Sequence, residues 1–229
     1  MAIRPIFVPL KNNVGVLEES IEFKWFSGFS LSQKQKSIAE LHSVANEMGH
    51  NRILEISSKS PDELGVSLSA FNLQVVTVKQ KRKFSVESAF QGSKVFEKGG
   101  PYVDLFQRTS LEAKRDIRLK ESGNLIKFQF FNSDFPIIPR TYFYDWLYIN
   151  ALLQNEELKE RLEEYSCFTD IEFNPQKSIN CQAHAVALYI SIKNKGLESQ
   201  LKDPSDFLSI ASGHYEKQER MISVQNKLV

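Results

Sequence analysis

No low-complexity linker and no internal repeat interrupts the chain, and this continuity most limits what it can fold into. The 10 glycines and 8 prolines are scattered along the 229 residues, as is typical of turns between short elements. We therefore expect residues 1–213 to form a single domain, with an N-terminal extension of irregular or short-strand structure over residues 1–24 and a polar tail over residues 214–229. A domain of this length buries roughly 70–75% of its unfolded surface, enough for a core without disulfides or metals.

Charge and cysteine content exclude several classes of protein. The 29 Lys and Arg residues and 28 Asp and Glu residues give a net charge of +1, which excludes a chain coated in basic residues but not a local patch for nucleic acid. Cys167 and Cys181 make no disulfide framework, which is typical of the reducing cytoplasm. The longest apolar stretch, residues 183–192, is shorter than the roughly 18 residues of a membrane span. Residues 1–13 lack a continuous apolar region, so we expect no secretory signal there. We expect a cytoplasmic protein with no membrane partner.

Helical spacing of apolar residues and turn residues predicts a mainly α chain with a few short β-strands, α+β by content. The predicted strands are 53–57, 73–78, 125–131 and, as strand or extended loop, 168–173. The predicted helices run from Ser30 or Ser32 to Gly49, from Ser85 to about Glu97, near 110–118, from Thr141 to Tyr165, from Ser178 to Gly196, and from Asp203 onward.

The predicted helix after Ser85 carries acid, aromatic, amide and amine side chains on one face. At about 100° per residue, Glu87 and Lys94 differ by only about 20° around the axis, with Phe90 and Gln91 between them. A mixed-charge face of this kind is more often solvated than functional. The apolar residues of this helix form no single opposite face, however, so we expect the helix to be enclosed and Glu87 or Lys94 to line a cleft.

Two basic segments have both a functional and an ordinary interpretation. Residues 79–83 (KQKRK) could attract phosphate beside a helix N-terminus, or form a solvated turn. Residues 25–36 (WFSGFSLSQKQK) place aromatic rings beside lysines, as in proteins that bind single-stranded nucleic acid, but we favour a hydrophobic clasp before a helix as the explanation.

The sequence predicts no metal site and no cofactor. Cys181 and His184 are three residues apart, but the chain offers no further ligands at the spacing of a closed zinc site. A core thiol beside a hydrogen-bonded histidine explains the pair better than a nucleophile and its base. Gly99 and Gly100 precede Pro101, which lacks the N–H that a phosphate loop needs.

Several segments, taken together, resemble the NADAR family, also called YbiA-like. Its pattern is a Leu-Ser-Asn-Phe element, a Ser-x-Glu-His helix followed by Gln and Lys, and then a helix with Trp. Residues 54–73 and 169–183 look more specifically like NADAR antitoxins paired with DarT-type toxins, and the resemblance covers roughly residues 20–212. The segments that match the general pattern are SLSAFNL (67–73), FSVESAFQGSK (84–94) and FYDWLYINAL (143–152).

The resemblance implies a YbiA-like fold and cleavage of an N-glycosidic bond at ADP-ribose. In the toxin-paired branch the substrate is guanine in DNA that a DarT-type ADP-ribosyltransferase has modified, and ADP-ribose is the product. The cognate toxin is a possible partner. Ala70, Ser88 and Phe90 replace the Asn, His and Tyr of the broad family, and the late Asp-x-x-Trp-Gly element is not recognisable. These departures argue against the branch that acts on a riboflavin-pathway intermediate.

The residues suit this chemistry. A base attached to C1 of ribose leaves poorly unless it is protonated, and Glu87 is the candidate general acid and base. The resemblance favours Lys94 as the nucleophile, forming a Schiff base with the opened ribose. The alternative is a retaining mechanism with two carboxylates, in which Asp145 or Asp170 is the second acid.

Substrate recognition is assigned to other side chains. Gln91 is retained from the family pattern. Lys59 and Asn72 are candidates for binding ribose or diphosphate, and Trp146 is a candidate for stacking on a base. Asp170 is a further candidate, on a segment expected to end at the cleft. Two rival functions remain open: a non-catalytic module that binds ADP-ribose or the toxin, and an N-glycosidase acting on a riboflavin-pathway intermediate.

Overall fold

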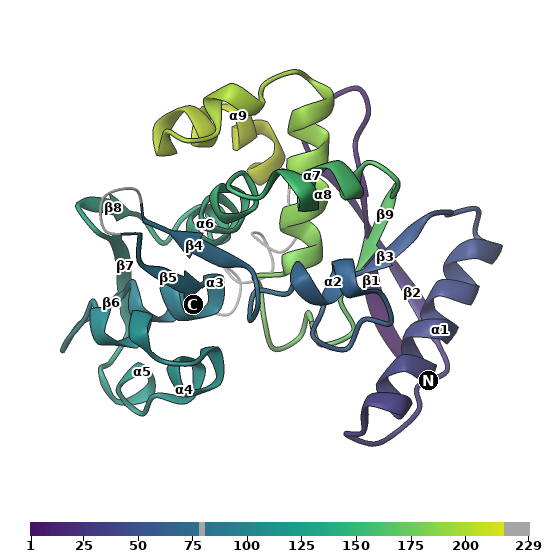
Figure 1. The fold of residues 1–229 in the computed structure, drawn as a ribbon, viewed down its shortest axis with the longest axis horizontal. Coiled ribbons are helices and arrows are strands. Elements are labelled where there is room, and N and C mark those ends of the chain that lie inside the picture. Colours follow the sequence, from purple (N-terminus) through teal and green to yellow (C-terminus); the bar gives the residue numbers. More distant parts are fainter. Residues whose placement is uncertain (78–80, 218–229) are drawn as a thin grey trace.

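The computed structural model describes residues 1–77 and 81–217, shown in Figure 1. The predicted α+β content is confirmed, with helices packed around small sheets whose strand orders are β2-β1-β9-β3, β6-β7-β8 and β4-β5. The helices are α1 (Leu31–Glu47), α2 (Glu63–Ser67), α3 (Val86–Gly92), α4 (Ser110–Arg115), α5 (Arg118–Glu121), α6 (Tyr142–Leu152), α7 (Glu156–Leu162), α8 (Gln182–Asn194) and α9 (Pro204–Tyr215), with 3-10 turns η1 (Val103–Gln107) and η2 (Glu198–Gln200). The strands are β1 (Ala2–Pro9), β2 (Val16–Phe23), β3 (Ile53–Glu55), β4 (Gln74–Val76), β5 (Lys83–Ser85), β6 (Lys94–Phe96), β7 (Leu125–Phe130), β8 (Ser133–Phe135) and β9 (Cys167–Thr169).

The N-terminal segment is a β-hairpin of two strands of 8 residues each, so of the two structures expected over residues 1–24, strand is correct and irregular structure is wrong. β1 pairs antiparallel with β2 along its whole length and also with β9. Ile6 and Phe7 are adjacent yet both fully buried, because Ile6 packs toward α1 and Phe7 packs into the core on the other face of the sheet. A strand covered on both faces shows no alternation, and Pro5 and Pro9 further obscure the strand signal in the sequence.

The core is built on α8 and α6, which pack against each other. The apolar run of residues 183–192 is the buried interior of α8, which contacts β1, β2 and β9. Figure 1 shows α8 near the centre of the molecule, with β6, β7 and β8 toward one end and α1 at the other. The segments that line the site therefore come from both sides of this central helix.

The helix that begins at Ser85 is shorter than predicted. Ser85 is its N-cap, as expected, but α3 ends at Gly92, and Lys94 starts strand β6, which pairs with β7. A Cβ on Gly92 would lie 2.6 Å from the Phe106 ring, so the close approach of η1 requires glycine where the helix ends.

Two further helix boundaries are corrected. The single helix predicted over residues 141–165 is divided into α6 and α7, because the Asn155 side chain accepts a hydrogen bond from Leu158 N and caps a new helix. The helix predicted from Ser178 begins instead at Gln182. Residues 174–178 form a turn closed by bonds from Lys177 N and Ser178 N to Asn174 O.

The C-terminal boundary also differs from the predicted one. Asp203 caps α9 as expected, but α9 extends through His214 and Tyr215, which are buried. The Tyr215 hydroxyl donates to Asp145 Oδ2 at 3.2 Å, which ties the end of α9 to α6. The predicted polar tail therefore includes two core residues, and its residues 218–229 lie outside the described residues.

Candidate active site

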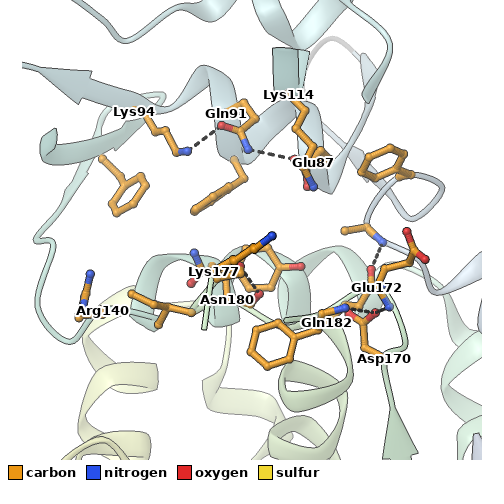
Figure 2. Close-up of a pocket in the computed structure, with 18 of the residues that line it drawn as sticks. Glu87, Gln91, Lys94, Lys114, Arg140, Asp170, Glu172, Lys177, Asn180 and Gln182 are labelled. Carbon is orange, nitrogen blue, oxygen red and sulfur yellow. Dashed lines mark hydrogen bonds and ion pairs between the residues drawn. The ribbon is translucent and has the colours of Figure 1, made fainter. Parts of the chain in front are cut away.

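A cleft of about 1570 Å³ opens between two walls that are far apart in the sequence. Figure 2 shows Glu87, Gln91, Lys94 and Lys114 on one wall. The facing wall is the segment from Asp170 to Gln182, which connects β9 to α8. The cleft exceeds the roughly 300–1,000 Å³ of pockets that enclose one small molecule, so it has room for a nucleotide and part of a larger substrate.

Backbone hydrogen bonds fix the first turn of α3 at the cleft. Glu87 N donates to Ala70 O and Val86 N to Leu73 O, each at 2.9 Å. The Ser85 side chain accepts from Ser88 N at 3.0 Å and completes the N-cap. The orphan N–H groups of a helix start are thus satisfied, and Glu87 is held on a rigid turn with only 6% of its surface exposed.

Glu87, Gln91 and Lys94 form one hydrogen-bonded chain along the wall. Gln91 Nε2 donates to Glu87 Oε1 at 2.9 Å, and Lys94 Nζ donates to Gln91 Oε1 at 2.7 Å. The predicted face is therefore present, although Lys94 extends it from β6 rather than from the helix. An amide that accepts from the amine and donates to the carboxylate keeps both groups pointed into the cleft (Figure 2).

The Lys94 ammonium is destabilised by its surroundings. The pKa of Lys94 is lowered to about 8, chiefly by burial. The Lys114 charge acts in the same direction, and the Glu87 carboxylate acts in the opposite direction. The Nζ atom lies 4.8 Å from the centre of the Phe90 ring. Phe90 itself packs on Phe128, Phe143 and Tyr144, so Lys94 sits over an aromatic floor that excludes water.

Lys114 is a site residue that the sequence analysis missed. It lies on α4, whose first turn is fixed by a capping box between Thr109 and Glu112. Its Nζ is 3.6 Å from Glu87 Oε1 and 5.2 Å from the centre of the Phe71 ring. α4 is only six residues long and is placed beside α3 by tertiary packing. The sequence therefore does not indicate that one of its lysines reaches the Glu87 carboxylate.

Gln182 joins the facing wall to the segment before α3. Its Oε1 accepts from Ala70 N at 2.7 Å, and its Nε2 donates to Ile56 O at 2.7 Å. Ala70 O in turn accepts from Glu87 N, so one residue connects the start of α8 to the start of α3. Gln182 was also missed, because a lone glutamine at a helix start has many equivalent interpretations.

The predicted substrate-binding residues are only partly brought together. Lys59 and Asp170 line the cleft with Gln91. Asn72 does not: it is exposed, and its side chain donates to Val66 O at 2.8 Å, which closes the turn before β4. Trp146 does not line the cleft either, because its ring packs on Phe130 and Phe135 in the core.

Asp145, the other candidate second acid, is fully buried behind the cleft rather than in it. Its Oδ1 lies 3.4 Å from His184 Nδ1, and His184 Nε2 lies 3.0 Å from His214 Nε2. His184 thus belongs to a buried network with α6 and α9, whereas the Cys181 sulfur lies 3.8 Å from Asp170 Oδ2. Cys181 and His184 therefore face different partners.

Cationic side chains predominate along the cleft. Several of them were not predicted from the sequence, since they come from short helices and loops that only the fold brings together. Among the described residues the cations of the lining are Lys59, Lys94, Lys114, Arg115, Arg140 and Lys177, and the carboxylates are Glu87, Asp170, Glu172 and Glu216.

A comparison with protein families matches residues 2–221 to DarT1-associated NADAR antitoxins. The chain belongs to this family. The resemblance to toxin-paired NADAR proteins is thereby confirmed, and the match includes the N-terminal hairpin as well as both walls of the cleft. A comparison with curated proteins gave no match.

The remaining expectations for this antitoxin concern metals, membranes and basic segments. Over residues 1–77 and 81–217, no three His, Cys, Asp or Glu side chains gather as a metal site, and no helix could cross a bilayer. Of the basic run 79–83, Lys79 and Gln80 lie outside the described residues. In the segment 25–36, Trp25 is half-buried between Arg4 and Lys34, and Lys34 pairs with Glu172 at the cleft.

Proposed function

We propose that this antitoxin is a glycohydrolase that removes ADP-ribose from guanine bases in DNA and so reverses the action of a DarT-type toxin. The observation that carries the proposal is the Glu87–Gln91–Lys94 chain in the wall of a large cleft. Membership of the DarT1-associated family supports the antitoxin role. The finer chemistry rests on what these side chains can do.

Lys94 is the proposed nucleophile. With a pKa of about 8, about a tenth of the Lys94 side chains are neutral one pH unit lower, far more than for an ordinary lysine. The amine bonds to C1″ as the bond from C1″ to the guanine nitrogen breaks, and the electron pair of that bond leaves with the base. The Lys94 nitrogen passes a proton to Glu87 and then forms the C=N bond of the Schiff base as the C1″–O4″ bond breaks, and O4″ takes the proton back from Glu87. Water adds to C1″, the bond to Lys94 breaks with its electron pair and one proton returning to the amine, and O4″ closes the ring on C1″ again.

Glu87 is the proposed partner of this amine. Gln91 and Lys114 both present donors to the Glu87 carboxylate, so it is placed to accept a proton that Lys94 releases, directly or through water. The overall reaction consumes one water molecule and yields ADP-ribose and unmodified guanine, provided that the departing nitrogen gains one proton.

The cations along the cleft suit an anionic substrate. Lys59, Lys114 and Arg115 lie within reach of the same opening, and a diphosphate or a DNA phosphate is the ligand that such a lining favours. Phe71 and Phe90 offer faces on which a base or an adenine could stack.

The test is the release of ADP-ribose from an oligonucleotide that carries ADP-ribosyl guanine. We expect Glu87→Gln and Lys94→Ala each to lower the rate by about 10²-fold or more. Glu160→Gln and Lys98→Ala, at exposed positions outside the cleft, are the matched controls and should retain the wild-type rate. Rates within a few-fold of wild type for both site variants would contradict the assigned site.

The same assay separates the rival functions. A non-catalytic module that binds ADP-ribose or the toxin would neutralise the toxin equally well after Glu87→Gln. An N-glycosidase of a riboflavin-pathway intermediate would act on a free nucleotide-like substrate and be indifferent to DNA.

A further inference from the structure

A buried pair of carboxyl groups lies in and behind the wall that faces Lys94. Asp170 follows β9 and lines the cleft with 6% of its surface exposed. Glu55, at the end of β3, is 1% exposed and pairs in register with Thr169, the neighbour of Asp170. The proposed route through Lys94 and Glu87 uses neither group, and burying two carboxyl groups together is costly unless the pair holds a proton.

Burial raises the pKa of Glu55 as well, but the hydrogen bonds around Glu55 act in the opposite direction and fit an ionised carboxylate. Its Oε1 accepts from Ile171 N at 2.8 Å, and its Oε2 accepts from the Thr169 hydroxyl at 2.6 Å. His42 Nε2 lies 2.9 Å from the same hydroxyl, and burial lowers the pKa of His42 to about 4. A neutral His42 that donates from Nε2 leaves the Thr169 hydrogen directed at Glu55, so both oxygens of Glu55 are acceptors.

Asp170 is the member of the pair that lines the cleft. Its Oδ1 accepts from Glu172 N at 3.0 Å and Phe173 N at 3.1 Å, and its Oδ2 accepts from the Cys181 thiol at 3.8 Å. The two backbone donors lower the pKa of Asp170, but burial, the largest effect, together with the Glu55 charge, raises it well above its usual range. The backbone donors hold Oδ1 in place, so Oδ2, with its longer contact to sulfur, is the oxygen that can carry the proton.

Charged and titratable groups reach Asp170 from every element packed against it. Arg4 is the cation among them and acts against protonation, whereas Glu55 and Glu172 favour it. Tyr144 lines the cleft and interacts electrostatically with both Asp170 and Glu87. Among the described residues these groups are Arg4 from β1, Glu55 from β3, Glu172 from the same segment, Tyr144 and Tyr148 from α6, and Cys181 at the start of α8.

We infer that Asp170 is the acid that protonates the departing base, and that Glu55 is a positioning residue that keeps Asp170 protonated. The inference rests on the proposed function and assigns the proton that the reaction requires. The Asp170 proton moves to the guanine nitrogen as that nitrogen takes the electron pair of the broken bond, leaving an Asp170 carboxylate. The carboxylate then recovers a proton from the water that adds to C1″, so the proton balance closes. Glu87 and Asp170 thus take opposite roles on opposite walls (Figure 2).

The first test compares two leaving groups. Asp170→Asn should lower the rate on ADP-ribosyl guanine by about 10²- to 10⁴-fold. An ADP-ribose that carries 4-nitrophenol at C1″ needs no proton for departure, so the same variant should hydrolyse it within a few-fold of wild type. Equal losses on both substrates, or no loss on guanine, would overturn the assignment. Glu160→Gln is the control for an exposed carboxylate and should leave both rates unchanged.

The second test reads the positioning role of Glu55 from a pH profile. Activity that needs protonated Asp170 is lost as pH rises through the pKa of Asp170. Because Glu55→Gln removes a neighbouring negative charge, that pKa falls and the alkaline limb moves to lower pH. A purely structural role would lower the whole profile without moving the limb, and that result would contradict the inference.

A third measurement does not depend on turnover or on a variant that folds. The carbon-13 signal of the Asp170 side-chain carboxyl, followed across a pH titration of the wild-type protein, should report the protonated form at neutral pH. A titration midpoint in the ordinary range of aspartate would overturn the inference. Should the wild-type protein not release ADP-ribose from guanine, the proposed function fails, and this signal still decides the protonation of Asp170.

Discussion

At the scale of single residues, the charge state of Lys94 decides what the cleft can do. Burial disfavours the ammonium, the face of the Phe90 ring favours it, and its two charged neighbours act in opposite directions. Gln91 separates the amine from Glu87, so Lys94 gains a hydrogen bond without a direct ion pair that would hold it charged. The arrangement favours an amine that is available as a nucleophile near neutral pH.

We predict that the neighbours of Lys94 shift its pKa in opposite directions. Glu87→Gln removes the charge that raises this pKa and should move it below about 8, whereas Lys114→Ala removes a repelling charge and should move it above about 8. Acetylation of Lys94 by acetic anhydride over a series of pH values, read by mass spectrometry, measures the midpoint. Identical midpoints in wild type and both variants would contradict this electrostatic account.

The sequence predicts part of the site and cannot predict the rest. Glu87 and Gln91 are about one helical turn apart, so spacing alone brings them to one face, whereas Lys94 joins them from β6. Lys114 and Gln182 reach the cleft only through tertiary packing, and no local pattern identifies them. Trp146 was predicted to be in the site and is not. An aromatic side chain can stack on a base or pack against the core, and Trp146 packs against the core.

At the scale of elements, close contacts between short helices and strands fix the positions of the two cleft walls. The close contact of α2 with β3 is one example, because a Cβ on Gly65 would lie 1.9 Å from Glu55 O and 2.4 Å from Ser60 Oγ. Glu55 is the buried carboxyl behind Asp170. The packing of α2 therefore also fixes one of the carboxyl groups behind the facing wall.

Gly65→Ala is predicted to destabilise the protein by about 2 kcal/mol or more, because backbone of β3 must move to admit one methyl group. Gly213→Ala is the matched control on α9, where nothing lies within 4 Å. It should be neutral or stabilise by up to about 1 kcal/mol, since alanine favours a helix over glycine. Urea denaturation of both variants gives the comparison, and equal midpoints would contradict the packing described.

The boundaries of helices and strands are wrongly predicted from the sequence where tertiary contacts compete with local conformational preference. α1 and α9 begin at Ser30 and Asp203 as predicted, because a cap is a local interaction. Lys94 joins a strand because β7 lies beside it, and the strand β1 is hidden because both its faces are covered. Some caps, such as Ser30, Ser85 and Asp203, can be predicted from a sequence, whereas the Asn155 cap was missed and sheet partners are set by the fold.

At the scale of the whole molecule, α8 and the sheet place two walls of different chemistry around one opening. One wall offers an amine and a carboxylate that accepts, and the other offers a buried carboxyl pair. A binding module needs neither a desolvated amine nor a buried acid. The combination favours catalysis over simple capture of ADP-ribose or toxin.

The measurement that tests this most directly is the number of ADP-ribose molecules released per protein molecule from an excess of guanine-modified oligonucleotide. We predict many equivalents for the wild-type protein, with Glu160→Gln equal to it and Glu87→Gln at or below one equivalent in the same time. Release that stops at one equivalent in the wild type, or that continues unchanged in Glu87→Gln, would contradict the claim that this cleft is an active site.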